Sequence, residues 1–284
     1  MIGETNIPAP NWHDIVAQEV PELRDIGPFP AEAIFSDGVR SERAFGGAAG
    51  MAQGPAFTAS ELDRIRELVK EQLIETAYRI APRTAAALAD LPLDQYHEAV
   101  ADQDHARLLS KLARVLPARS VDVIRQMSFF DYAARAFGPF YLSDEENIGH
   151  EQICFRVVRP NRREDVGSLH RDAWFWDYFQ FPVPPGISRV KVWVPVCGAP
   201  RQTGLLLAPG THRQPAGYRT ESVGGKLAFI PEIDPALVDL RRFAGNPGDP
   251  VMFNYDVLHV GALTRGDISR VSFEITIMFR SGQA

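Results

Sequence analysis

Two histidines, an aspartate and an arginine are the residues of this sequence best suited to chemistry. His170 and Asp172 are separated by one residue, and Arg270 follows His259 by eleven positions. Two imidazoles and one carboxylate form a ligand set that holds non-haem Fe(II) on one face and leaves the other positions open for reactants. A planar guanidinium can hold a carboxylate with two charge-assisted hydrogen bonds. The four residues therefore predict a metal site with an anion-binding group beside it.

The part of the chain that carries these residues predicts an antiparallel β-structure. Apolar and polar residues alternate in five segments separated by turns rich in proline and glycine, namely 152–158, 190–196, 204–208, 251–258 and 269–279. In the last segment Val271 and Phe273 share one face, whereas Arg270 and Glu274 share the other. We expect a β-sandwich whose apolar face is covered by helices and whose polar face lines a ligand cavity. A sheet with its polar face in water is the alternative.

The spacing of the four residues fits such a sandwich. Residues two apart in an extended strand point the same way, so His170 and Asp172 can face one ion. A glycine-containing turn before Arg270 is expected to fold the chain back, so that Arg270 runs antiparallel beside the strand that ends at His259. His212, which follows a Pro-Gly-Thr turn, competes as the third ligand. It has no arginine eleven positions later, and His259 is the better candidate.

Other polar or aromatic residues are expected near the cavity. Gln152 and Arg156 lie on the inferred inward face of their strand and are candidates for contacting a cofactor or substrate, and Lys191 and Trp193 face the same way. Ordinary cross-strand pairing explains these positions equally well. The aromatic segment 173–182 predicts a lid or cavity wall, with a loop packed onto the helices as the alternative.

The first half of the chain predicts helices after an extended arm. Thr58 and Glu61 have the spacing of a capping box, and apolar residues then recur at helical intervals until Pro82. Two further helical stretches are expected over 104–116 and 121–137. We expect a single domain over residues 1–284, in which 1–56 form an extended arm and loops, 57–140 a helical cover, and 150–280 the β core.

Composition argues against several classes of partner. The chain has 284 residues, a net charge of −6 and two cysteines, Cys154 and Cys197. Phosphate-rich partners require a basic surface, so we expect no nucleic-acid or anionic-membrane binding. The first residues lack the pattern of a secretory leader, and no stretch has the length and apolar character of a membrane span. These features predict a cytoplasmic enzyme with a small-molecule substrate, and they leave its oligomeric state open.

Several motifs resemble one known family over roughly residues 150–280. They are His170-Arg171-Asp172, the turn Leu205-Leu206-Leu207-Ala208-Pro209-Gly210-Thr211-His212, Trp193 on its strand, and Gly248-Asp249-Pro250-Val251-Met252-Phe253 leading to His259 and Arg270. Together they resemble the phytanoyl-CoA dioxygenase family of Fe(II)/2-oxoglutarate-dependent oxygenases. One position departs from the pattern, because Gly261 stands where many members carry a hydroxyl residue.

The resemblance implies a fold, a cofactor set and a reaction. The fold is a double-stranded β-helix, or jelly roll, flanked by N-terminal helices. Its iron ligands are His170, Asp172 and His259, and Arg270 anchors 2-oxoglutarate. With Fe(II), 2-oxoglutarate and O2, such an enzyme hydroxylates an unactivated C–H bond and releases succinate and CO2. The acidic, single-domain character of the chain, rather than the family name, leads us to expect a small polar or anionic metabolite or natural-product intermediate as the substrate.

Two other functions remain open from the sequence. One is a cupin-like metal enzyme that does not use 2-oxoglutarate, and the other is a non-catalytic β-sandwich that only binds a ligand. Arg270 discriminates between the first of these and the oxygenase, because only a co-substrate with a second carboxylate requires it.

Overall fold

The computed structural model describes residues 50–223, 225–234 and 237–280. Most of the predicted extended arm, 1–56, lies outside these residues. Its described end contains a short strand, β1 (Met51–Gln53), which pairs antiparallel with β9 (Val251–Asn254). This end of the predicted arm is therefore part of the main sheet.

The long predicted helix is α3 (Ala59–Ile80), and its capping box is present. The Thr58 backbone N–H donates to Glu61 Oε2 at 2.8 Å, while Glu61 N donates to Thr58 Oγ1 at 3.3 Å. The apolar positions predicted from helical spacing are buried, among them Ile65, Val69 and Leu73. These contacts confirm the prediction, because the cap satisfies free N–H groups and the apolar stripe faces the core.

The other two helical stretches are shorter than predicted. In place of 104–116 the structure has α6 (Asp102–Leu108), after which the chain turns. In place of 121–137 there are two helices, α7 (Ala118–Arg125) and α8 (Ser128–Phe137). Met127 between them has an extended backbone with ψ 157°, which ends one helix and starts the next with Phe129 and Phe130 buried. The remaining helices of this region are α4 (Pro82–Asp90), η2 (Leu93–Gln95) and α5 (Tyr96–Ala99).

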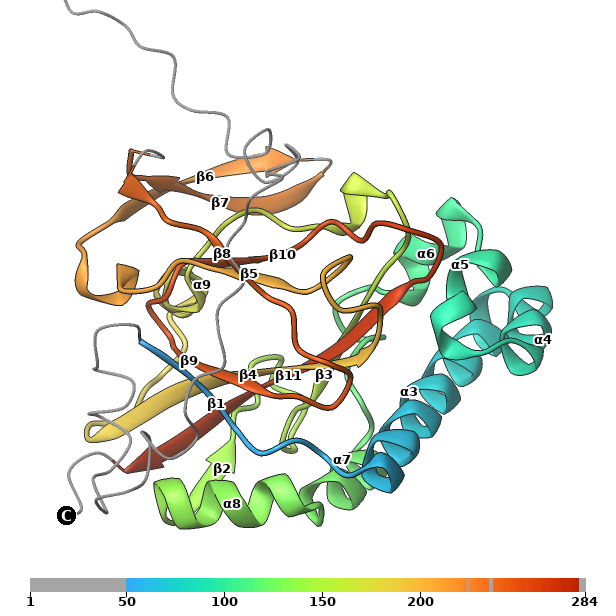
Figure 1. Cartoon of the computed structure of the whole chain (residues 1–284), viewed down its shortest axis with the longest axis horizontal. Coiled ribbons are helices and arrows are strands. Elements are labelled where there is room, and N and C mark those ends of the chain that lie inside the picture. Colours follow the sequence, from blue (N-terminus) through green and yellow to red (C-terminus); the bar gives the residue numbers. More distant parts are fainter. Residues whose placement is uncertain (1–49, 224, 235–236, 281–284) are drawn as a thin grey trace, which may run out of the picture.

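The described strands form two main antiparallel sheets and a hairpin (Figure 1). The larger sheet has the order β1-β9-β4-β11-β2, with β3 also paired to β11, and the smaller sheet has the order β10-β5-β8. The hairpin pairs β6 (Gly217–Val223) with β7 (Lys226–Glu232). The other strands are β2 (Phe140–Leu142), β3 (Cys154–Val158), β4 (Ile187–Cys197), β5 (Leu205–Leu207), β8 (Arg241–Phe243), β10 (His259–Gly261) and β11 (Arg270–Arg280). The fold is the predicted jelly roll with flanking helices.

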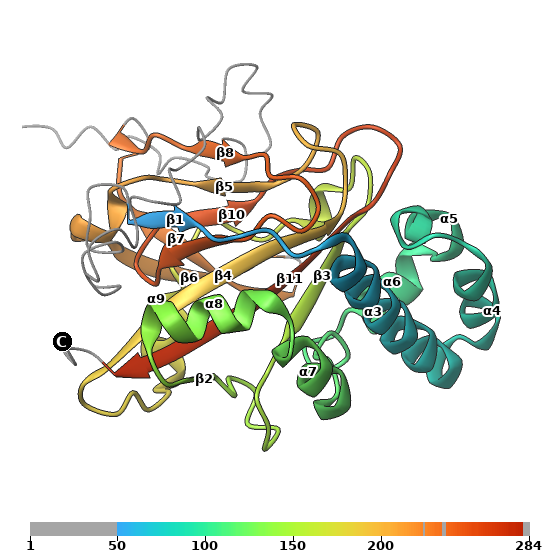
Figure 2. The ribbon, with the colours of Figure 1, turned by 60° about the horizontal axis from the view of Figure 1, so that its bottom comes forward.

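The two faces of the larger sheet have different environments. Its apolar face includes Val192, Val194, Phe273 and Ile275, and it shares one buried cluster with side chains of α3, α7 and α8. Figure 2 shows these helices lying along that side of β4 and β11. The opposite face of the same strands carries Lys191, Glu274 and Thr276 into a cavity. The alternation in the sequence therefore marks a covered sandwich with a ligand cavity, rather than a sheet with one face in water.

One predicted strand pairing is wrong. His259 lies on β10, which pairs with β5, and Arg270 begins β11, which pairs with β4. The two residues thus belong to different sheets, and the turn between them crosses the sandwich instead of closing a hairpin. The reason is that both edges of β11 are occupied, one by β4 and the other by β3 and β2. No edge remains for β10.

A buried polar network joins the helices to the segment before His170. Arg159 donates to both oxygens of Asp165 at 2.8 Å, and His105 Nε2 lies 3.1 Å from Asp165 Oδ1. Tyr96 OH lies 3.2 Å from the other ring nitrogen of His105. Burial alone would raise the pKa of Asp165, but the bonds from Arg159 and His105 hold that pKa well below its usual range.

Asp165→Asn is expected to lower the free energy of unfolding by about 3 kcal/mol at pH 7, because it leaves the buried Arg159 guanidinium with exposed carboxylates only. A carboxyl whose folded-state pKa is lowered stabilises the fold above its unfolded pKa of about 4, and this contribution is lost as the pH falls towards the folded value. Urea denaturation should therefore show the full difference in free energy of unfolding between the wild type and Asp165→Asn at pH 7, and a smaller difference below about pH 4.

The control is Asp63→Asn, which breaks an exposed ion pair with Arg66 of 2.8 Å. It should change the free energy of unfolding by less than about 1 kcal/mol. Equal effects of the two substitutions at pH 7 would contradict a stabilising role for the Asp165 network.

No helix in the described ranges combines the length and the apolar character that crossing a membrane requires.

Candidate active site

His170, Asp172 and His259 come together at one end of the smaller sheet. His170 and His259 form an isolated antiparallel bridge, with backbone N–H to O distances of 3.1 and 2.9 Å. Asp172 is the first residue of α9 (Asp172–Phe179), and Arg171 before it is extended, with φ −109° and ψ 141°. The extended backbone predicted for His170 to Asp172 is therefore present up to Arg171, and Asp172 begins a helix instead of continuing a strand. One ligand atom from each of the three residues lies within 4.8 Å of those of the other two.

Backbone contacts orient both imidazoles towards a common centre. His170 Nδ1 lies 2.7 Å from the Ser168 carbonyl oxygen, and His259 Nδ1 lies 3.0 Å from the Val257 carbonyl oxygen. An Nδ1–H that donates to a carbonyl leaves Nε2 with a free lone pair, the form that ligates metals. The two Nε2 atoms lie 3.7 and 3.8 Å from the oxygens of Asp172, longer than hydrogen bonds.

The charges and the unmet hydrogen bonds of this group fit a divalent metal ion. Asp172 Oδ2 is buried and has no hydrogen-bond partner. Burial would raise the pKa of Asp172, but Lys191 and the two histidines hold it well below its usual range, so the carboxylate is ionised. Burial lowers the pKa of His259 to about 4, so its ring is neutral at pH 7. An ionised carboxylate and neutral imidazoles are the donors that Fe(II) requires.

A buried lysine lies beside the Asp172 carboxylate. Lys191 Nζ lies 3.7 Å from Asp172 Oδ2 and 4.0 Å from Glu145 Oε1. Glu145 is itself held by the hydroxyls of Thr276 at 2.6 Å and Ser143 at 3.0 Å. Lys191, which the sequence placed on the inward face, therefore restrains the orientation of Asp172.

Arg270 is a buried guanidinium that is only partly satisfied. The residue is 2% exposed, its Nη1 donates to the Gly204 carbonyl, and its Nε has no partner. Among the residues that the structure describes, no carboxylate forms an ion pair with it. Burial, and next the repulsion from Arg156, lower the pKa of Arg270 to about 10. A buried cation without a counter-ion is costly, and an incoming carboxylate would relieve that cost.

Gly261 makes room for this guanidinium. A Cβ atom at Gly261 would lie 2.8 Å from Arg270 Nη2 and 3.2 Å from Nη1. The position where many family members carry a hydroxyl residue is thus occupied here by the tip of Arg270. The glycine at position 261 therefore leaves the space that the Arg270 guanidinium occupies.

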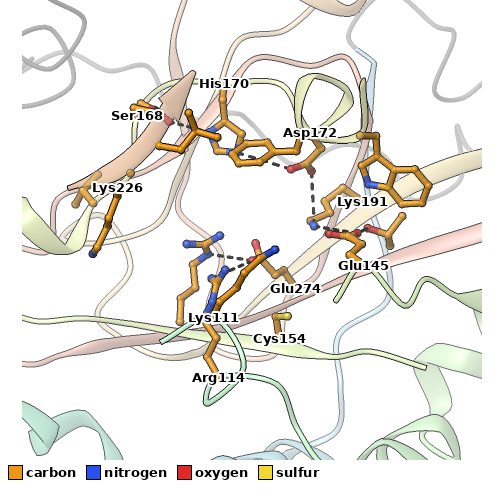
Figure 3. Close-up of a pocket in the computed structure, with 18 of the residues that line it drawn as sticks. Lys111, Arg114, Glu145, Cys154, Ser168, His170, Asp172, Lys191, Lys226 and Glu274 are labelled. Atoms are coloured by element: carbon orange, nitrogen blue, oxygen red, sulfur yellow. Dashed lines mark hydrogen bonds and ion pairs between the residues drawn. The ribbon is translucent and has the colours of Figure 1, made fainter. Parts of the chain in front are cut away.

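A cavity of about 980 Å³ opens beside His170 and Asp172. Its lining includes His170 and Asp172, and aromatic side chains from the segment 173–182, namely Phe175, Trp176, Phe179 and Phe181. This segment, most of which belongs to α9, therefore forms a wall of the cavity. Figure 3 shows His170 and Asp172 on one side of the cavity and Arg114 and Glu274 on the other.

The remaining predicted contacts divide between the cavity and the core. Gln152 and Arg156 line the cavity. The Gln152 side chain is engaged, with the Glu146 N–H at 3.0 Å and Cys154 Sγ at 2.8 Å. Trp193 is not among the cavity-lining residues; it packs in a buried apolar cluster, and its ring lies 5.8 Å from Arg270 Cζ. That these residues contact a cofactor stays a prediction.

His212, the competing candidate for the third ligand, lies outside the group formed by His170, Asp172 and His259. Its ring faces Gly50, where an added Cβ atom would lie 2.3 Å from its Nδ1. Arg114 and Glu145, by contrast, line the cavity without having been predicted. Both lie in turns between regular elements, and no local pattern in the sequence indicates where such side chains point.

A jelly roll that brings two histidines and an aspartate to the edge of a deep cavity is the arrangement of a non-haem iron oxygenase. The family model of phytanoyl-CoA dioxygenase (PhyH) matches residues 53–272. The chain belongs to the phytanoyl-CoA dioxygenase family, and it is an Fe(II)/2-oxoglutarate-dependent oxygenase that uses O2.

The solved structures to which this chain is similar are distant in sequence. The non-heme monooxygenase ThoJ, in its apo form, is 14% identical, with 83% of this chain and 77% of that chain covered and a TM-score of 0.49. EvdO2 from Micromonospora carbonacea var. aurantiaca is 16% identical, with 84% and 89% covered and a TM-score of 0.49. The non-heme alpha ketoglutarate dependent carbocyclase SnoK from nogalamycin biosynthesis is 15% identical, with 90% and 91% covered and a TM-score of 0.46. No curated protein sequence matches this chain significantly.

Proposed function

We propose that the protein hydroxylates an unactivated C–H bond of a small polar or anionic metabolite or natural-product intermediate, with release of succinate and CO2. The proposal is supported by a group of two imidazoles and a carboxylate that could hold a metal ion, together with a buried arginine that forms no ion pair among the described residues. Such an arginine suits a co-substrate that has one carboxylate for the metal and another for a guanidinium.

In this proposal each group of residues has a distinct task. His170, Asp172 and His259 hold the iron, and Arg270 binds the distal carboxylate of 2-oxoglutarate. When bound, iron and 2-oxoglutarate together supply, with O2, the oxidant that removes hydrogen from a C–H bond. Lys191 keeps Asp172 oriented, since it is the cation nearest to the carboxylate oxygen. The aromatic wall formed by α9 excludes water from the reacting centre.

The two alternatives lack an equivalent supporting observation. A cupin-like enzyme without 2-oxoglutarate gives no reason to bury Arg270 without a carboxylate. A non-catalytic binding protein gives no reason to orient two imidazoles and an ionised carboxylate around one centre. The expected absence of nucleic-acid partners and the expected cytoplasmic location stay predictions.

The test is succinate formation by the purified full chain. With Fe(II), ascorbate and O2, 2-oxoglutarate alone should give slow, substrate-independent succinate release, and a substrate found by screening should raise the rate by at least about tenfold. Anaerobic addition of 2-oxoglutarate to the Fe(II) form should produce a visible charge-transfer band. Absence of both the band and the succinate would reject the proposed function.

A further inference from the structure

The cavity side opposite His170 and Asp172 carries Arg114 and Glu274 (Figure 3), and the Glu274 carboxylate is shared with a second guanidinium, that of Arg156. Arg156 Nε lies 2.9 Å from Glu274 Oε1, and Arg114 Nη1 lies 3.8 Å from the same oxygen. All three residues line the cavity. We call this cluster of Arg114, Arg156 and Glu274 the cavity floor. It carries a local surplus of one positive charge.

Most N–H donors of Arg114 and Arg156 make no hydrogen bond to the described residues. In the described part of the chain, Arg156 makes one side-chain hydrogen bond, through Nε, and Arg114 makes none. Both side chains line the cavity, and 45% of the Arg156 side chain and 18% of the Arg114 side chain stay exposed. The repulsion from Arg156, and then burial, lower the pKa of Arg114. An anion between the two guanidiniums would relieve this repulsion.

Two of the lysines that line the cavity are already paired. Lys111 Nζ lies 2.7 Å from Glu146 Oε2, and Lys191 lies between Asp172 and Glu145. Although burial would raise its pKa, the surrounding cations lower the pKa of Glu274 to about 2, so this carboxylate stays ionised and counts as one negative charge. The nearby carboxylates of Glu146 and Asp172 are shared with Lys111 and Lys191, so no unpaired carboxylate among the described residues offsets the surplus on the floor.

We infer that the cavity floor is a subsite for the carboxylate of the substrate, and that the aromatic wall of α9 holds the apolar body of the same molecule. A carboxylate matches the one-unit surplus, whereas a phosphate monoester carries about −1.5 to −2 charges at pH 7 and would exceed it. The inference rests on the proposed function, because the metal-binding residues lie across the cavity from the floor. It assigns Arg156, expected to contact a cofactor or substrate, to the substrate.

The subsite also bears on which part of the substrate is oxidised. With the carboxylate on the floor, across the cavity from His170 and Asp172 (Figure 3), the C–H bond that faces these two residues is expected to belong to the body of the molecule. The cavity volume of about 980 Å³ leaves room for such a spanning molecule beside Phe175, Phe179 and Phe181.

Calorimetric titration with 4-phenylbutyrate and its neutral amide, 4-phenylbutyramide, tests the subsite. The full chain is loaded with zinc(II), which is redox-inert, and saturated with 2-oxoglutarate, so that the co-substrate site is filled. The carboxylate is expected to bind at least about tenfold more tightly than the amide. Equal affinities, or no measurable binding of the carboxylate, would overturn the inference.

Three variants locate the effect. Arg114→Met should reduce the carboxylate preference to about twofold or less, whereas Glu274→Gln should increase it, since it removes the opposing charge. Arg135→Met is the matched control, because Arg135 is an exposed arginine of α8 outside the cavity lining, and it should leave the preference unchanged. A preference that survives Arg114→Met, or that falls in folded Glu274→Gln protein, overturns the inference.

The test of the subsite gives a result that is independent of the test of the proposed function. The titration is repeated without metal and 2-oxoglutarate, and the preference should persist because no floor residue is a proposed ligand. If the iron form releases no succinate while the preference holds, the proposed reaction is rejected and the anion site stands. If succinate forms but the preference is absent, only the subsite is rejected.

Discussion

His259→Ala is expected to abolish tight iron binding and, with it, succinate formation. The three ligand atoms converge within 4.8 Å, and the loss of one leaves a two-point site. Even residues that only orient metal ligands change metal affinity by roughly 10–100-fold, so removal of a ligand should exceed about 100-fold. Iron content after anaerobic loading and dialysis measures this effect directly. Asp172→Ala should give the same result, because it removes the only proposed carboxylate ligand.

His212→Ala is the matched control for this prediction. It removes an imidazole that the sequence offered as the third ligand but that lies outside the metal-binding group. Iron stoichiometry should stay that of the wild type, measured at a temperature where circular dichroism shows both variants to be folded. Loss of iron in His212→Ala, together with retention in His259→Ala, would reverse the ligand assignment.

Arg270→Leu is expected to weaken 2-oxoglutarate binding by roughly 100-fold or more, because two charge-assisted hydrogen bonds are lost, each contributing about 1.5–3 kcal/mol. Iron content should not change. The fold should tolerate the substitution, since it replaces a buried guanidinium that has no ionic partner among the described residues with an apolar side chain. Anaerobic titration of the Fe(II)·2-oxoglutarate band gives the affinity. A change below about threefold would favour the metal enzyme that does not use 2-oxoglutarate.

Gly261→Ala provides a graded version of the same experiment. The added Cβ would approach the Arg270 guanidinium to 2.8 Å, and the flexible end of that side chain must shift. A displaced guanidinium keeps its charge but loses its alignment, so 2-oxoglutarate affinity should fall several-fold and by less than in Arg270→Leu. An unchanged affinity in Gly261→Ala would show that the glycine does not determine where Arg270 lies.

The sequence alone determined the properties that depend on residue type and local period. The residue types and their spacing predicted that His170, Asp172 and His259 come together. The alternation along 190–196 and 269–279 predicted which side chains face the helices and which face the interior of the sandwich. The capping box at Thr58 and Glu61 fixed the start of α3. These predictions hold because strand and helix geometry orient side chains over a few residues, whatever the rest of the chain does.

Only the tertiary structure decided the contacts between distant segments. It showed that β11 uses both edges within the larger sheet, so that His259 and Arg270 reach the interior from opposite sheets. It also placed Arg114, from a turn after α6, beside Glu274 on β11. Such contacts depend on which strand occupies each free edge and on how helices pack over a sheet. Because this competition involves segments far apart in the chain, no local pattern of residues encodes its outcome.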